Sequence, residues 1–308
     1  MAPTIAITGS ASGIGASIAR LYASKGYNLV LSDHAADLLS QTSSLIQSRF
    51  PSVQILTKQA DVSNVADLVA LKDAALARFD SIDVVVLNAG VHGDYKVADQ
   101  QGGWWGNPQA IKQLYDVNLF GVINGIHAFL PSLRTQTPQS SSSSLVHKRI
   151  VITGSKQGIT NPPGNPAYNS SKAAIRYLAE QLSFELKDEL VNVHLLVPGW
   201  TFTGIVGGPV GAVFDQQDNN EHDGATTTLT KPAGAWTSDQ VAEYLQAGIE
   251  REEFYIICPD NETSEQTDQV RMAWTAGDLT SRRPPLSRWR PEFKQEFEKF
   301  AADYNNKK

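Results

Sequence analysis

Residues 4–15 read TIAITGSASGIG. Positions 4–8 have the apolar pattern of a buried β-strand, positions 9–15 form a glycine-rich turn, and helical apolar periodicity follows. Glycine adopts backbone angles that a Cβ disfavours and lets the main chain approach a ligand closely, and the free N–H groups of a helix start face an anion. A glycine-rich surface turn would have a similar composition. We interpret the stretch as a phosphate-binding loop made by Gly9, Ser12, Gly13, Ile14 and Gly15.

Short apolar runs alternate with segments of helical period along the chain. With residues 4–8, the predicted strands are 29–32, 53–57, 83–87, 149–153, 192–197 and 254–257. The predicted helices are 14–24, 36–48, 65–79, 108–133, 166–190 and 238–250. Continuous apolar strands separated by helices are typical of a parallel sheet that is covered on both faces. The expected fold class is α/β, a Rossmann-type doubly wound parallel sheet of about seven strands with helices on both faces.

No internal repeat or linker divides the chain, so residues 1–308 are expected to form a single domain. A glycine- and proline-bearing stretch, part of a predicted substrate loop at about 204–235, is too long for a plain connection. It is either a functional lid or disordered. The C-terminal extension, about 278–308, ends in a polar amphipathic helix. This helix is expected to pack on the body or on a partner subunit.

The composition excludes several classes of protein. The chain has 26 Lys+Arg and 32 Asp+Glu, so its net charge is 26 − 32 = −6, and it has no basic run of the kind that binds nucleic acid or an anionic membrane. Its apolar runs are far shorter than the ~18–20 residues of a spanning helix, and its N-terminus has a strand pattern in place of a signal segment. A single cysteine, Cys258, excludes an intrachain disulfide and fits a reducing compartment. We expect a soluble, cytoplasmic protein.

An acidic residue follows the second predicted strand. Asp33 comes 18 residues after Gly15, at the carboxyl edge of the sheet. In a dinucleotide-binding unit such a carboxylate accepts hydrogen bonds from the adenosine ribose hydroxyls and repels a 2′-phosphate. The position predicts NAD as the cofactor and makes NADP less favoured, and His34 is the one weak cationic exception nearby. The alternative is that Asp33 only caps the following helix.

Tyr168 and Lys172 are four residues apart in a segment of helical period, so their side chains share one helix face. Forming a tyrosine phenolate at pH 7 costs roughly 4 kcal/mol, because the ordinary pKa is near 10. A nearby ammonium supplies part of that by favouring the charged form. This pair is a candidate acid/base unit. The alternative is an exposed pair on a helix surface.

Ser155 follows the predicted strand 149–153, at the carboxyl end where open α/β sheets bind ligands. Its hydroxyl can donate a hydrogen bond to a substrate oxygen and stabilise charge that develops there. Most serines after strands only form turns. The placement of Ser155 13 residues before Tyr168 favours the functional interpretation.

These motifs together resemble the classical short-chain dehydrogenase/reductase family. The resemblance covers about residues 4–203 and rests on the glycine loop, on Asn88-Ala89-Gly90, on Ser155 and on the segment Tyr168-Asn169-Ser170-Ser171-Lys172. It implies that Tyr168 moves the proton at the substrate oxygen and that Lys172 also binds the nicotinamide ribose. It further implies that Asn118 holds a water of the proton relay through its backbone.

The resemblance also completes the cofactor bed. It assigns Asp61 and Val62 to the adenine, Asn88, Ala89 and Gly90 to the close passage of the chain beside the adenine, and Pro198, Gly199, Thr201 and Thr203 to the nicotinamide side. Two alternatives stay open, because Asn88 could instead tie strands together and Asp61 could cap a helix. Trp200 and Phe202 are bulky for the nicotinamide segment and are expected to narrow the substrate space.

The sequence lacks the residues that metal-dependent chemistry and a Ser-His-Asp hydrolase would need. The six histidines are scattered with no i, i+4 pair, so no metal site is predicted. The segment Gly154-Ser155-Lys156-Gln157-Gly158 has its second glycine one position too late for a hydrolase elbow.

We therefore expect an NAD-dependent oxidoreductase that transfers a hydride between nicotinamide and a secondary alcohol or ketone. The substrate pocket is expected to be lined by residues 92–95, Trp104, Trp105, Lys156, Gln157, Pro162, Trp200, Phe202 and the loop 204–232. Lys156 would either attract an acidic substrate or point to water. The resemblance implies a homodimer or homotetramer built through the long helices at 108–133 and 166–190. The alternative function is a non-catalytic NAD(H)-binding regulator or scaffold.

Overall fold

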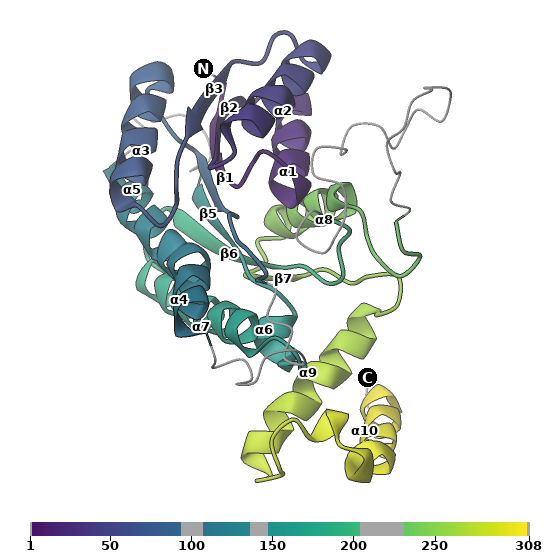
Figure 1. Ribbon diagram of the computed structural model, residues 1–308. Helices are drawn as coiled ribbons and strands as arrows, with labels where there is room; N and C mark the ends of the chain where they lie inside the picture. Colours follow the sequence, from purple (N-terminus) through teal and green to yellow (C-terminus); the bar gives the residue numbers. More distant parts are fainter. Residues whose placement is uncertain (1, 94–106, 136–146, 204–230, 307–308) are drawn as a thin grey trace.

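The computed structural model describes residues 2–93, 107–135, 147–203 and 231–306 (Figure 1). Within them, one parallel sheet has the order β3-β2-β1-β4-β5-β6-β7. The strands are β1 (Thr4–Thr8), β2 (Asn28–Asp33), β3 (Ile55–Gln59), β4 (Val84–Leu87), β5 (Lys148–Thr153), β6 (Val191–Val197) and β7 (Tyr255–Ile257). From β1 the chain adds β2 and β3 on one side, and it then adds β4 to β7 on the other side. Such a switch point, here between β1 and β4, opens a crevice at the carboxyl ends of the strands.

Helices cover both faces of the sheet. One layer contains α1 (Gly13–Ser24), α2 (Ala36–Arg49) and α8 (Ser238–Glu250). The other contains α3 (Val65–Phe79), α5 (Gly121–Thr135) and α7 (Pro166–Glu185), with α4 (Pro108–Tyr115) beside them (Figure 1). The predicted doubly wound α/β fold is confirmed.

The two layers explain why the strands are apolar at successive positions. Ile5 and Ile7 point into the cluster beneath α1, α2 and α8, whereas Ala6 between them belongs to the cluster beneath α3, α5 and α7. All residues of β1 and β4 are buried. A strand that is buried on both faces cannot carry an exposed polar row, and this produces the continuous apolar pattern.

Two helix predictions need correction, and one long helix was missed. The predicted helix 108–133 is divided by a π-helical turn, η2 (Asp116–Phe120), where the buried side chain of Asn118 bonds to the backbone of Val91. The predicted helix 166–190 ends at Glu185. A further helix, α9 (Glu265–Thr280), was not predicted, because its buried residues, Asp268, Val270 and Trp274, make too narrow and too polar a stripe.

The C-terminal segment forms an arm that extends from the sheet (Figure 1). It contains α9, two 3₁₀ turns, η4 (Ser287–Trp289) and η5 (Pro291–Phe293), and α10 (Lys294–Asn306). Trp274 of α9 is 1% exposed, its ring centroid lies 5.3 Å and 5.2 Å from those of Phe297 and Phe300, and the guanidinium of Arg283 lies 3.7 Å from its ring centroid. The predicted terminal helix therefore exists, and it packs on α9.

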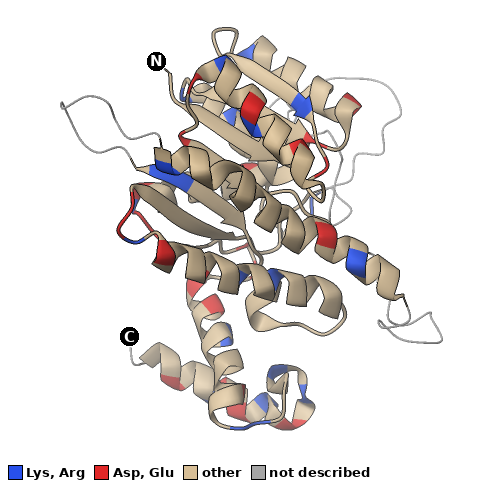
Figure 2. Ribbon diagram, turned by 90° about the vertical axis from the view of Figure 1, so that its left-hand side faces the viewer, with Lys and Arg blue, Asp and Glu red and all other residues tan. Residues whose placement is uncertain are grey.

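Charged residues of both signs are scattered over the helices of the body and of the arm (Figure 2). No described helix is both long enough and apolar enough to cross a bilayer.

Candidate active site

The glycine loop joins β1 to α1 at the switch point of the sheet. Gly9 and Gly13 have φ angles of +65° and +53°, which side-chain-bearing residues rarely adopt. A Cβ on Gly15 would lie 2.1 Å from the carbonyl oxygen of Gly9, and one on Gly9 would lie 2.7 Å from the Cα of Ala89. The N-cap residue Ser12 makes no side-chain capping bond, and the first turn of α1 carries no acid. An uncapped helix start beside close-packed glycines fits the pyrophosphate of a dinucleotide.

Asp33 lies at the end of β2, beside this loop. Its Oδ2 accepts the N–H of Ala11 at 3.0 Å, its Oδ1 accepts the N–H of Ala35 at 3.1 Å, and the Nδ1 of His34 lies 3.1 Å from Oδ1. Its side chain is 10% exposed. The carboxylate thus bridges the glycine loop and the start of α2, which is where the sequence predicts the ribose of a cofactor.

The segment after β4 connects three strands. The Nδ2 of Asn88 donates to the carbonyls of Thr8 at 3.3 Å and Gly9 at 3.1 Å, and its Oδ1 accepts the hydroxyl of Thr153 at 3.2 Å. Asn88 therefore does tie neighbouring strands together, as one alternative proposed. A Cβ on Gly90 would lie 3.2 Å from Asn118 Oδ1 and 3.5 Å from Lys172 Nζ. The absence of a side chain at Gly90 therefore leaves room for the side chains of Asn118 and Lys172.

Asp61 and Val62 follow β3. The Oδ1 of Asp61 accepts both the N–H and the hydroxyl of Ser63, at 2.9 Å and 2.7 Å. The N-cap of α3 is Asn64, so the interpretation of Asp61 as that cap is wrong. Val62 is buried, and its carbonyl accepts the side-chain amide of Asn124 at 2.9 Å.

Helix α7 carries the tyrosine and the lysine. It begins with Pro166 at its first turn, and its N-cap Asn165 accepts the N–H of Tyr168 at 3.2 Å. Lys172 is 5% exposed, and its Nζ donates to the carbonyl of Thr153 at 2.9 Å and lies 5.8 Å from the ring centroid of Tyr168. The alternative of an exposed surface pair is therefore wrong.

Helix α6 (Gln157–Thr160), which follows Ser155, packs directly on α7. A Cβ on Gly158 would lie 2.5 Å from the carbonyl carbon of Lys172 and 2.8 Å from the N atom of Ala173. The absence of a side chain at Gly158 thus allows backbone-to-backbone contact between the two helices. Ser155 and Tyr168 are brought together, close enough for the Ser155 hydroxyl to lower the pKa of the Tyr168 phenol.

Burial changes the acidity of both groups on α7. Burial raises the pKa of Tyr168, and the hydrogen bond with Ser155 lowers it by less. Burial lowers the pKa of Lys172 to about 8. At neutral pH the phenol is therefore protonated and the amine is mostly charged, a state in which Tyr168 can donate a proton to a bound oxygen.

Asn118 connects the tip of β4 to α7. Its Oδ1 accepts the N–H of Val91 at 2.7 Å, and its Nδ2 donates to the carbonyl of Val91 at 2.8 Å and to the hydroxyl of Ser171 at 3.2 Å. The side chain is thus engaged within the fold, so the predicted water relay would have to use the Asn118 backbone.

The segment after β6 returns toward the glycine loop. The N–H of Phe202 donates to the carbonyl of Trp236, and the N–H of Trp236 donates to the carbonyl of Trp200, both at 2.9 Å. Thr201 and Thr203 are buried, and the Cγ2 of Thr203 lies 3.3 Å from the position of a Cβ on Gly13. The segment predicted for the nicotinamide therefore lies beside the segment predicted for the phosphates.

The expected pocket lining is only partly described. Tyr95, Trp104, Trp105 and the loop residues 204–230 lie outside the described residues. His92 lies against the tyrosine, with ring centroids 4.7 Å apart and planes at 50°. Trp200 is 40% exposed.

Lys156 departs from both expectations for it. Its Nζ lies 3.2 Å from Asp260 Oδ2 and 2.5 Å from Asp268 Oδ2, and the three side chains are 12%, 7% and 3% exposed. Its ammonium does not point to water, and it is already paired with two carboxylates of the protein, so it is not free to bind an acidic substrate. The sequence does not reveal the pairing, because the two aspartates follow Lys156 by more than one hundred residues.

Comparison with known families matches the short chain dehydrogenase family over residues 3–208. The chain belongs to the short-chain dehydrogenase family. The resemblance inferred from the motifs is confirmed, and with it membership of a family of oxidoreductases.

Relatives extend the likeness beyond the matched region. An uncharacterized oxidoreductase of Listeria monocytogenes is 29% identical over 81% of this chain and 91% of its own. A short chain dehydrogenase/reductase from Burkholderia phymatum, solved in complex with NAD, is 26% identical, with a TM-score of 0.75 over 92% of this chain and 96% of its own. An alcohol dehydrogenase from Thermococcus sibiricus, complexed with 5-hydroxy-NADP, is 26% identical, with a TM-score of 0.63 over 81% and 91%. The solved relatives thus include a complex with NAD and one with an NADP derivative.

Proposed function

We propose that this short-chain dehydrogenase interconverts a secondary alcohol and the corresponding ketone with NAD as the cofactor. The observation that carries the proposal is the convergence of Tyr168, Ser155 and Lys172 at the carboxyl ends of β4 and β5, next to the glycine loop. A phenol, a hydroxyl and an amine arranged in this way suit proton transfer at a substrate oxygen.

The cofactor would be held along the carboxyl edge of the sheet. The glycine loop and the start of α1 would bind the pyrophosphate, Asp33 the adenosine ribose, Lys172 the nicotinamide ribose, and the segment from Pro198 to Thr203 the nicotinamide. When bound, the nicotinamide supplies the hydride chemistry that amino-acid side chains lack. The carboxylate of Asp33 disfavours a 2′-phosphate and supports NAD over NADP.

The side chains divide the proton chemistry among them. Ser155 and Tyr168 would both hydrogen-bond the substrate oxygen and so orient the reacting carbon. In reduction the Tyr168 hydroxyl donates its proton to that oxygen, and in oxidation the phenolate accepts the proton of the alcohol. The ammonium of Lys172 stabilises the phenolate. Since burial raises the pKa of Tyr168, reduction is favoured at neutral pH and oxidation gains as the pH rises.

Replacing the tyrosine hydroxyl tests the proposal. Absorbance of the reduced nicotinamide is followed with a panel of secondary alcohols and ketones for the wild type and for Tyr168→Phe. Loss of general acid/base catalysis is expected to lower kcat by about 10²–10⁴-fold. Tyr177→Phe is the matched control, because Tyr177 lies on the same helix and is 60% exposed.

The control should keep the wild-type rate. Equal rates for the wild type and Tyr168→Phe on the same substrate would refute the proposed mechanism. Binding of NAD(H) by a protein that turns over nothing in the panel would favour a regulator or scaffold.

A further inference from the structure

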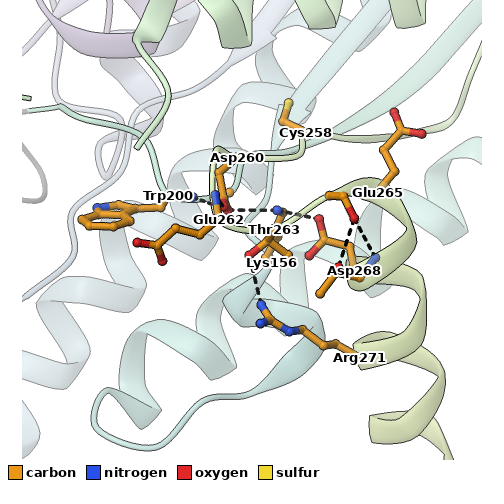
Figure 3. Close-up of polar contacts among 12 residues, drawn as sticks. Lys156, Trp200, Cys258, Asp260, Glu262, Thr263, Glu265, Asp268 and Arg271 are labelled. Carbon is orange, nitrogen blue, oxygen red and sulfur yellow. Dashed lines mark hydrogen bonds and ion pairs between the residues drawn. The ribbon is translucent and has the colours of Figure 1, made fainter. Parts of the chain in front are cut away.

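A buried ion cluster lies behind the catalytic serine (Figure 3). Lys156, the residue after Ser155, directs its ammonium between Asp260 and Asp268. Asp260 belongs to the turn that follows β7, and Asp268 belongs to α9. The cluster therefore connects the C-terminal arm, whose first helix contacts α6, to the loop that carries Ser155.

The same cluster contacts the segment on the other side of the site. Asp260 Oδ2 accepts the N–H of Trp200 at 3.2 Å, and the N–H of Lys156 donates to the carbonyl of Pro198 at 3.2 Å. A Cβ on Gly199 would lie 2.6 Å from Asp260 Oδ2 and 2.7 Å from Lys156 Nζ. The ion pair thus packs directly against the Gly199 backbone.

The turn that carries the Asp260 carboxylate is itself held in place. Asp260 and Thr263 exchange backbone hydrogen bonds at 3.0 Å and 3.2 Å, Asp260 Oδ1 accepts the N–H of Glu262 at 3.1 Å, and Arg271 of α9 donates to the hydroxyl of Thr263 at 3.0 Å. Figure 3 shows this chain of contacts from Trp200 through Asp260 and Thr263 to Arg271. Asp260 is therefore fixed by contacts other than the one with Lys156.

Lys156 is the main counter-charge of both carboxylates, and Arg271 adds a weaker attraction at Asp268. For Asp260, burial acts to raise the pKa, but attraction to Lys156 and hydrogen bonds outweigh it and the pKa is lowered. For Asp268, burial raises the pKa and outweighs the contact with Lys156. One ammonium shared by two buried carboxylates cannot be withdrawn without leaving a charge unpaired, which is strongly unfavourable.

We propose that Lys156 is a positioning residue of the active site, which fixes the Ser155 loop and the Gly199–Trp200 segment relative to each other through Asp260 and Asp268. The proposal rests on the function proposed for Ser155 and for the nicotinamide segment. It assigns a role in catalysis to the C-terminal arm, since α9 supplies Asp268. Ser155 and not Lys156 touches the substrate.

The test combines substitution with a matched control at the start of β5, the strand that leads to the Ser155 loop. Lys156→Met and Asp268→Asn remove the cluster's cation and one of its anions. Lys148→Met is the control, because Lys148 lies at the opposite end of β5 and pairs with Asp83 at 2.6 Å, with side chains 11% and 19% exposed. Lys156→Arg restores the positive charge.

Amide hydrogen exchange is measured first, since it needs no turnover. Exchange in residues 154–160 and 199–203 should be at least about 10-fold faster in Lys156→Met and Asp268→Asn than in the wild type, because local opening loses its restraint. Lys148→Met should leave both segments unchanged. Equal acceleration in the control, or no acceleration in either cluster variant, would overturn the proposal.

Kinetics then separate positioning from general stability. A misplaced hydroxyl should lower kcat of Lys156→Met by about 10–100-fold, with KM for the alcohol or ketone changed far less. Lys156→Arg should recover most of the loss, and Lys148→Met should stay near the wild type. An unchanged kcat in Lys156→Met would refute the role. If the wild type turns over no substrate, the proposed function fails, whereas the exchange measurement still decides whether the cluster holds the two segments.

Discussion

At the scale of single residues, the proposed active site consists of polar groups that are largely shielded from solvent. Asn88, Asn118 and Lys172 are each hydrogen-bonded to the backbone of a neighbouring segment. Burial of a charged or polar group is costly unless such partners exist. The buried polar groups therefore lower the stability of the fold while they fix the geometry of the site. Substitutions that remove them should make the protein more stable and less active.

Lys172 gives the clearest case. Its pKa is lowered from 10.5 to about 8, so the folded state releases this proton more readily than the unfolded state. The buried charge then costs stability below pH 8, and the cost is lifted as the pH rises from 8 to 10.5. We expect Lys172→Met to raise the free energy of unfolding at pH 7 by about 1–3 kcal/mol while activity is lost.

Urea unfolding at pH 7 and at pH 10 measures this gain, which should shrink at the higher pH. Lys187→Met, at a lysine whose side chain is 55% exposed, is the control and should change little. A variant of Lys172 that is less stable than the wild type at pH 7 would contradict the expectation.

A second prediction at this scale concerns Asp33 and the preference for NADH over NADPH. We expect Asp33→Asn to weaken NADH binding and to narrow the preference for NADH over NADPH by about 10-fold, because the carboxylate no longer repels a 2′-phosphate. Fluorescence titration with both cofactors measures this. Asp37→Asn, an equal change of charge in the exposed first turn of α2, is the control. Tighter binding of NADPH than NADH by the wild type would reverse the cofactor assignment.

At the scale of elements, the sequence predicted what depends on local pattern. Inner strands such as β1 and β4 were found because burial on both faces makes them apolar throughout, and the pair on α7 because four residues make about one turn of a helix. The edge strand β3 is half-buried and polar toward its end, and it begins two residues after the predicted 53–57. A polar residue within an apolar helix, such as Asn118, can distort that helix by competing for backbone hydrogen bonds. The π turn itself could not be predicted, since it depends on the side chain reaching the backbone of Val91 across the fold. The same holds for α9 and for the partners of Lys156, which only tertiary packing brings together.

At the scale of the whole molecule, apolar side chains remain exposed on the helices through which the resemblance implies pairing. Phe120 of η2 is 50% exposed, and Tyr177 and Phe184 of α7 are 60% and 67% exposed. Exposed apolar surface of this kind is typical of contact faces. We infer that they belong to the interface of a homodimer or homotetramer.

Sedimentation tests this inference. The wild type is expected to sediment as a dimer or tetramer at micromolar concentration, and Phe184→Asp to shift it toward the monomer, because a charge buried in an interface is unfavourable. Leu279→Asp, at a position of α9 that is 84% exposed, is the control and should leave the assembly intact. A wild-type monomer would refute the expected pairing.

The contact of α6 with α7 at Gly158 has a consequence for how this enzyme can diversify. The hydroxyl of Ser155 and the phenol of Tyr168 are spaced by two main chains that touch, with the Cβ position only 2.5 Å from the carbonyl carbon of Lys172. Even Gly158→Ala would force α6 and α7 apart and so move the Ser155 hydroxyl away from the Tyr168 phenol. Substitutions that admit a new substrate are therefore expected elsewhere around the site, because a side chain at residue 158 would push the two helices apart.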